Sequence, residues 1–267
     1  MKPLLSLAAA AAIAALPLSA QAHDRFLLPS STVLSAENAW ITVDAAAGND
    51  KFYFNHNRLA LDNLAVTAPD GSAVQPQNVS QGRLRSTFDL NLTQAGTYRI
   101  ALVNNGAFAR WEENGQPKRW FGKPADLAAN VPAGAAKLQV SESFSRLETF
   151  VTLGKPSALT PSGQGLELVA QTHPNDLYAG EQADFQLMLD GKPASGVKVV
   201  IVPGGSRYRD QVGEISLTTD AGGKFSVKWP QAGMYWLDAD AEDDKTAVKQ
   251  ADKRRLAYTA TFEVLPQ

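Results

Sequence analysis

The 267-residue sequence contains no cysteine, three histidines and three methionines. The lack of cysteine excludes disulfide bridges, thiolate metal sites, a cysteine nucleophile and a lipid anchor at an N-terminal cysteine. Only Met188 and Met234 lie beyond the N-terminal segment, so a thioether-rich Cu(I) site is disfavoured as well. A chain of this length buries a core without disulfide bridges, so their absence does not limit stability.

An excess of charge of one sign is also lacking. The formal net charge is −2 at pH 7, and it becomes −3 without residues 1–22, because that segment carries Lys2 and no acid. Nucleic acids and anionic lipid surfaces call for a basic patch, so neither is expected as a partner. The sequence contains no G-x-S-x-G, Walker, Rossmann or zincin motif.

Long apolar runs are absent beyond the N-terminus. Residues 1–22 combine Lys2, an apolar stretch over Leu4–Leu18 and the triplet Ala20-Gln21-Ala22, which is the pattern of a secretory signal peptide. The stretch is interrupted by Pro17 and falls short of the about 20 apolar residues that a membrane span needs. We therefore expect an exported, periplasmic protein that is cleaved after Ala22, with no transmembrane segment in the mature chain.

Short runs of alternating polarity fill the rest of the sequence and are separated by turn sequences, which favours strands. We predict an all-β protein of two immunoglobulin-like β-sandwich domains. The first domain covers residues 23–155 and the second covers residues 166–267. A segment rich in Gly and Pro, residues 156–165, is the predicted linker.

Residues 104–135 break this pattern. They contain Gly, Pro, Asn and mixed charge without a sustained period, and long connections of this kind inside a compact domain are usually functional or disordered. We expect a long irregular loop at this place. Its Trp111 and Trp120 would form a hydrophobic latch, and the alternatives are that they stack on a sugar or close over a cleft.

The histidines are His23, His56 and His173. Taken singly, each is best explained as a polar residue of a loop or strand end. A histidine at the N-terminus differs, because its α-amine and imidazole Nδ1 can chelate one metal ion. The ordinary pKa of the amine, about 7.7–8.0, makes its deprotonation at neutral pH easy. A second imidazole would complete a three-nitrogen set that suits Cu(II) or Ni(II), with Co or Zn next.

Either His173 or His56 would supply the second imidazole, and both alternatives stay open. His173 lies in a turn sequence near the predicted domain boundary, where ligand sites often form, and His56 follows an aromatic strand. Asp24 and Asp176 are candidate oxygen ligands. The acidic run at 238–244 lacks the glycine and final glutamate of an EF-hand loop, and we interpret it as a solvated strand end.

Several stretches resemble a family of exported bacterial proteins described as a domain of unknown function or as periplasmic components of cobalt- and nickel-type uptake. These stretches are AHDRFLLPS, RLETFVTLGKP, THPNDLYAGEQADFQLMLDGKPASGVKVVIV and TTDAGGKFSVKWPQAGMYWLDADAED. The resemblance implies a β-rich periplasmic protein linked with metal acquisition. It also implies that His23, His173, Asp176 and Tyr178 stand at family positions. Residues 166–267 are similar to carboxypeptidase-regulatory and transthyretin-like sandwiches as well.

We therefore expect a soluble periplasmic binding protein for a divalent transition metal, acting in uptake or buffering with an envelope metal transporter or receptor as partner. The expected ion is copper, or else nickel or cobalt. We expect a binding protein rather than an enzyme. Two alternatives remain. One is a copper-dependent oxidase that uses the same three nitrogens, and the other is a module that binds a protein or glycan of the envelope without metal.

Overall fold

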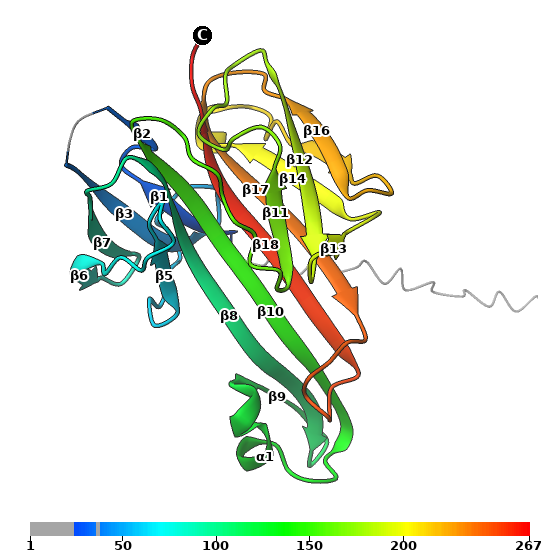
Figure 1. The fold of residues 1–267 in the computed structure, drawn as a ribbon. Coiled ribbons are helices and arrows are strands. Elements are labelled where there is room, and N and C mark those ends of the chain that lie inside the picture. Colours follow the sequence, from blue (N-terminus) through cyan, green and yellow to red (C-terminus); the bar gives the residue numbers. More distant parts are fainter. Residues whose placement is uncertain (1–23, 36–37) are drawn as a thin grey trace, which may run out of the picture.

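The computed structural model describes residues 24–35 and 38–267, which fold almost entirely into strands (Figure 1). The strands are β1 (Asp24–Pro29), β2 (Val33–Leu34), β3 (Ala39–Gly48), β4 (Asn57–Arg58), β5 (Leu64–Thr67), β6 (Gln77–Gln81), β7 (Ser86–Leu92), β8 (Gly96–Glu113), β9 (Gln116–Gly122), β10 (Ala136–Leu153), β11 (Leu166–Ala170), β12 (Gln182–Leu189), β13 (Lys192–Pro193), β14 (Lys198–Pro203), β15 (Ile215–Thr218), β16 (Lys224–Lys228), β17 (Gly233–Asp243) and β18 (Lys253–Val264). In this part of the chain, no helix has the length and apolar character needed to cross a bilayer.

The described strands form three sheets. The first sheet has the order β1-β3-β7-β6, with β4 beside β3, and the third consists of β11, β12, β13 and β16. Between them lies a nine-stranded central sheet of order β15-β14-β17-β18-β10-β8-β5, to which β2 and β9 are added. Alternation explains the strands locally. In β7 every second side chain is buried, with Phe88, Leu90 and Leu92 on the core side.

The central sheet supplies both hydrophobic cores. On one face, Ile100 and Val151 pack with Phe88 of the first sheet. On the other face, the rings of Phe150 and Phe185 both stack on Phe262, at centroid distances of 6.3 and 5.8 Å. The prediction of an all-β sandwich is therefore confirmed. Because β10 pairs with β18 of the second half, the two halves joined through residues 156–165 share one sheet.

Each half also contains a tyrosine corner, a hydrogen bond from a tyrosine hydroxyl to backbone a few residues upstream that is a hallmark of immunoglobulin-like sandwiches. The hydroxyl of Tyr98 accepts hydrogen bonds from the backbone N–H of Thr93 and Gln94, at 3.1 and 2.8 Å. The hydroxyl of Tyr235 donates to the carbonyl oxygen of Gln231 at 2.8 Å. Both tyrosines follow the sequence Gln-Ala-Gly-x, a short repeat that relates the two halves.

The irregular loop predicted for residues 104–135 is wrong. The segment contains the end of β8, the strand β9, a 3-10 turn (Pro124–Asp126) and the single-turn helix α1 (Leu127–Asn130). The missed signal is Asn114-Gly115, which adopts φ values of 51° and 73° and closes a two-residue hairpin between β8 and β9. Trp111 and Trp120 pack partly buried in the small core of this hairpin, as the latch interpretation expects.

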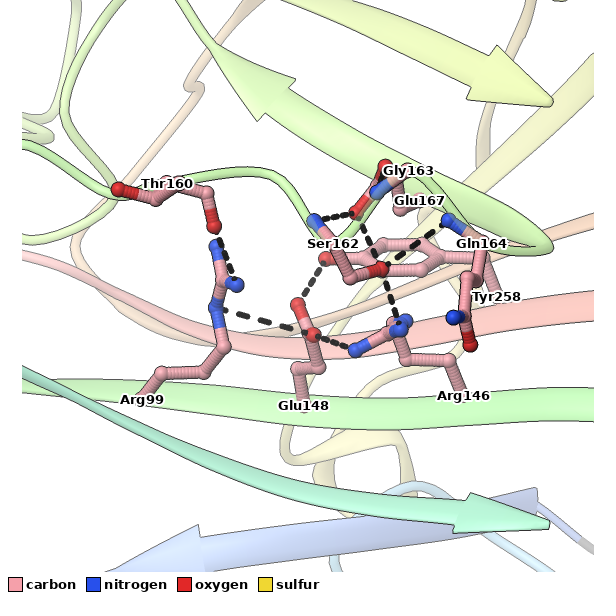
Figure 2. Close-up of polar contacts among 9 residues, drawn as sticks. All are labelled: Arg99, Arg146, Glu148, Thr160, Ser162, Gly163, Gln164, Glu167 and Tyr258. Carbon is pink, nitrogen blue, oxygen red and sulfur yellow. Dashed lines mark hydrogen bonds and ion pairs between the residues drawn. The ribbon is translucent and has the colours of Figure 1, made fainter. Parts of the chain in front are cut away.

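A buried polar network fixes the connection between β10 and β11 (Figure 2). Glu148, on β10, accepts hydrogen bonds from Arg146 Nη1 at 3.0 Å and from the Tyr258 hydroxyl at 3.1 Å. The Nε of Arg99 approaches the same carboxylate at 3.9 Å. Burial and the charge of Glu148 raise the pKa of Tyr258, so this hydroxyl stays protonated and donates.

The same network continues onto residues 154–165, the crossing segment that connects β10 with β11. Arg99 donates to the Thr160 carbonyl oxygen at 2.8 Å, and Arg146 donates to the Ser162 hydroxyl at 2.7 Å. The carboxylate of Glu167 accepts from the backbone N–H of Ser162 and from that of Gly163, both at 2.7 Å. Two arginines and two glutamates thus balance in charge and tie the Gly- and Pro-rich segment to the central sheet.

Replacing Glu148 with alanine is expected to lower the free energy of unfolding by about 3–5 kcal/mol, because two guanidinium groups lose the carboxylate that compensates them in a buried place. Urea denaturation measures the change. The matched control is Glu113→Ala, whose partner Lys118 lies 3.7 Å away on the surface and whose loss should cost about 0–1 kcal/mol. Equal effects of the two substitutions would contradict this account of the network.

Candidate functional site

The corner at which β1 begins is the candidate site, because Asp24, a predicted ligand, directly follows the predicted ligand His23 in the sequence. His23 lies outside the described residues. Asp24 stands opposite Gly48 of β3, and β1 as a whole lies across the face of the central sheet that carries the first sheet, in contact with β10 and β18 (Figure 1). The end of β1 that carries Asp24 is therefore held by the core architecture.

Three contacts fix this strand end. The carboxylate of Asp24 forms an ion pair with Lys51 at 2.8 Å. The Lys51 ammonium also lies 4.6 Å from the ring centroid of Trp236, a cation–π contact. The indole Nε1 of Trp236 donates to the carbonyl oxygen of Arg25 at 2.9 Å. Since Trp236 belongs to β17, these contacts place the start of β1 over that strand.

Asp238 and Asp240 project from β17 on the same face as Trp236, because alternate residues of a strand share a face. Burial, together with the charges of Asp240 and Asp24, raises the pKa of Asp238 to about 6, against a hydrogen bond from Thr259 at 2.9 Å and the charge of Arg25. Burial also raises the pKa of Asp240. The interpretation of this acidic run as a solvated strand end is therefore wrong for Asp238, which is half-buried beside the start of β1.

His56 lies in the same corner. It is exposed and directly precedes β4, whose Asn57 stands opposite Ala47 of β3. On its other side, Ala47 stands opposite Arg25 of β1. Two interstrand spacings, about 10 Å, therefore separate the backbone after His56 from the backbone after Asp24.

His173 lies elsewhere, on the opposite face of the central sheet, and its ring is fully engaged. Its Nδ1 accepts from the backbone N–H of Asn175 at 3.1 Å. Its Nε2 therefore carries the hydrogen, and lies 3.0 Å from the hydroxyl of Thr97 and 3.1 Å from the carbonyl oxygen of Ser157. Burial lowers the pKa of His173, so the ring stays neutral and ties β8 to the crossing segment.

Asp176 follows His173 in the same turn, where its backbone N–H donates to the His173 carbonyl oxygen at 2.9 Å, and its side chain is exposed. The structure thus brings Asp24 and His56 to one corner and His173 and Asp176 to another. Within residues 24–35 and 38–267, no three His, Asp or Glu side chains are placed to hold a metal ion together. A metal site at the first corner therefore needs donors from His23.

Sequence reasoning missed the role of Asp238 and Lys51. The alternating acids of DADAED do place carboxylates on one face of a strand, and that signal is local. The missing information was which other strand crosses that face, since Asp24 and Asp238 are separated by most of the chain and meet only through the pairing and packing of β1.

The sheets and tyrosine corners define an all-β sandwich protein. Residues 20–243 match the family described as "Domain of unknown function (DUF4198)", and the chain belongs to this family. No curated protein matches it.

Among solved structures, the chain is similar to the D0-D1 domain of intimin, with 12% identity, 88% of this chain and 96% of that chain covered, and a TM-score of 0.22. It is also similar to a Salmonella alpha-2-macroglobulin reacted with methylamine, with 14% identity and a TM-score of 0.21, where the match covers 90% of this chain and 15% of that chain. A marsupial T cell receptor is similar with 8% identity and a TM-score of 0.20, and the match covers 92% of this chain and 72% of that chain. The assignment to the all-β sandwich class follows from the three sheets of this chain and not from these similarities.

Asp238 makes stability depend on pH in a defined direction. Its pKa is raised from 3.8 to about 6 in the folded state, so folding favours the protonated form, and the free energy of unfolding falls as pH rises between these values. The contribution is about 3 kcal/mol, since one pKa unit corresponds to about 1.4 kcal/mol.

An Asp238→Asn variant should lose that contribution. Between about pH 4 and about pH 7, the free energy of unfolding of the unmodified chain is expected to fall by about 3 kcal/mol more than that of Asp238→Asn. Urea denaturation at a series of pH values measures both. Asp62→Asn, at an exposed position before β5, is the control and should follow the unmodified chain. If Asp238→Asn left the pH dependence of the free energy of unfolding unchanged, the raised pKa of Asp238 would be refuted as its cause.

Proposed function

We propose that the processed chain binds one divalent transition metal ion, copper or nickel in the first place, at the corner where β1 begins. It would serve metal uptake or buffering in the periplasm. The observation that carries the proposal is the gathering of the Asp24, Asp238 and Asp240 carboxylates where the start of β1 lies over β17. Burial first of all, and then the charges of Asp240 and Asp24, raise the pKa of Asp238 to about 6 against the charge of Arg25. These carboxylates therefore lie near one another, and a bound cation would reduce their mutual repulsion.

The donor set follows from covalent geometry and from the described residues. His23 precedes Asp24 by one peptide bond, which separates consecutive Cα atoms by about 3.8 Å. After cleavage, His23 would offer its α-amine and imidazole, and Asp24 would offer an oxygen. A nitrogen- and oxygen-rich set of this kind suits Cu(II) and Ni(II), with Co and Zn next. Metal binding would compete with Lys51 for the Asp24 carboxylate.

His56 is favoured over His173 as the second imidazole. His56 precedes the strand that lies two positions from β1 in the first sheet, in the same corner as Asp24. His173 would have to give up its hydrogen bond from Asn175 or turn its Nε2 away from Thr97 and Ser157, and the central sheet separates it from β1.

Two further observations support the physiological part of the proposal. The signal-peptide pattern of residues 1–22 supports export, and with it the free amine that the site needs. The resemblance to proteins described as periplasmic components of cobalt- and nickel-type uptake supports a role in acquisition, with an envelope transporter or receptor as the receiving partner.

Calorimetric titration with Cu²⁺ and Ni²⁺ tests the donor set. The chain that begins at His23 is compared with one that retains Ala20-Gln21-Ala22 and with the variants His23→Ala and His56→Ala. Retention of the three residues, or loss of His23, should weaken binding by more than about 100-fold, because the loss of outer-shell partners alone costs about 10- to 100-fold. His56→Ala should weaken binding by about 10-fold or more.

His173→Ala is the matched control. It should leave the metal affinity unchanged and lower the free energy of unfolding by about 1–3 kcal/mol, because buried partners lose their hydrogen bonds. Loss of metal binding in His173→Ala together with full binding in His56→Ala would show that His173, and not His56, supplies the second imidazole. Equal affinity of the cleaved and the extended chain would refute the N-terminal site altogether.

A further inference from the structure

A polar cleft of about 550 Å³ opens on the central sheet next to β1, which is within the about 300–1,000 Å³ typical of small-molecule sites. Its lining comes from β1, β8, β9, β10 and β18, from the turn before β5 and from Lys123, which follows β9. The lining side chains include Arg25, Asn63, Asn104, Phe121, Ser143 and Ser145. None of these belongs to the donor set of the proposed metal site.

Small residues create the cleft. Asn104 of β8 stands opposite Ser145 of β10, and Gly106 stands opposite Ser143 in the next row of the same face. On β18, Ala257 stands opposite Ser145. One row further along the same face, Leu102 faces Leu147 and the first sheet covers it as core. The floor of the cleft is therefore a stretch in which hydroxyl, amide and small side chains replace the large apolar ones.

Hydrogen-bonding groups converge on this floor. Asn63 Nδ2 donates to Asn104 Oδ1 at 2.9 Å, which holds two amides side by side with further donor and acceptor atoms on each. The guanidinium of Arg25 lies 3.4 Å from the hydroxyl of the buried Ser145. Lys123 adds a second cation to the lining. Among the residues that the structure describes, no carboxylate lines this cleft. Arg25 also acts on the nearby carboxylates of Asp238 and Asp240, so Lys123 is the cation of the lining that those carboxylates do not share.

An aromatic ring borders the same cleft. Phe121 of β9 is 64% exposed, the largest exposed fraction among the phenylalanines of the described chain. Its place depends on Gly106, since a Cβ atom there would lie 2.8 Å from Phe121 Cζ. A large ring kept in water beside hydroxyl and amide groups is typical of a binding surface, because one face of the ligand can pack on the ring while its polar groups bond below.

We propose that this cleft binds a sugar acid. The C–H face of a pyranose ring would pack on Phe121, and its hydroxyls would exchange hydrogen bonds with Asn63, Asn104, Ser143 and Ser145. Its carboxylate would lie toward Lys123, because the charge of Arg25 is shared with Asp238 and Asp240. This inference does not depend on the metal site, because no atom of the metal donor set takes part in it.

The test uses the full processed chain after metal removal with a chelator, so that failure of the metal site cannot affect the result. D-glucuronate is titrated and followed by amide chemical shifts, with D-glucose and acetate for comparison. We expect saturable binding of glucuronate that is at least about fivefold tighter than that of glucose, and no saturable binding of acetate.

Substitutions locate the binding. Phe121→Ala should weaken glucuronate binding about tenfold, in line with the loss of an aromatic contact, while Val79→Ala, at an exposed apolar position of β6, should not change it. Lys123→Gln should reduce the preference for glucuronate over glucose, and Lys155→Gln, an exposed control, should keep it. Absence of saturable glucuronate binding, or equal glucuronate affinity of Phe121→Ala and the unmodified chain, would overturn the proposal. Equal affinity of the unmodified chain for glucuronate and glucose would overturn the claim that the cleft recognises the carboxylate.

Discussion

Strand β10 has to satisfy a hydrophobic core on each of its two faces, and most of the architecture depends on that constraint. Neighbouring residues of the strand, Phe150 and Val151, belong to different cores. Because both faces of the strand are covered, its polar side chains are shielded from water and need hydrogen-bond partners within the protein. Glu148 finds its partners in Arg146 and Tyr258, and these contacts in turn tie down the connection to the third sheet.

The same constraint shapes the corner where β1 begins. Because the first sheet must cover one face of the central sheet, its edge strand β1 crosses β17 and brings Asp24 toward Asp238. Two negative groups then share a partly desolvated place, compensated in the structure by Lys51 and Arg25. The architecture thus places Asp24, Asp238 and Asp240 together at the strand end where we propose the metal site.

Local patterns were enough to predict the strands and the sandwich class. The alternation in β7 is readable from sequence, and Asn114-Gly115 could have shown that residues 104–135 hold a hairpin. Non-local facts were out of reach. Sequence does not tell that β10 pairs with β18, that both ring nitrogens of His173 are engaged, or that His56 shares a corner with Asp24. Each of these depends on chain crossings that no local period encodes.

The central claim is that cleavage behind Ala22 creates a metal site with three nitrogen donors, two from His23 and one from His56. Electron paramagnetic resonance of the processed chain loaded with one equivalent of Cu²⁺ tests it most directly, because nitrogen ligands split the copper signal. The account predicts splitting from three nitrogens that falls to two in His56→Ala and is unchanged in His173→Ala. A spectrum that stays the same in His56→Ala, or when Ala20-Gln21-Ala22 is retained, would contradict it.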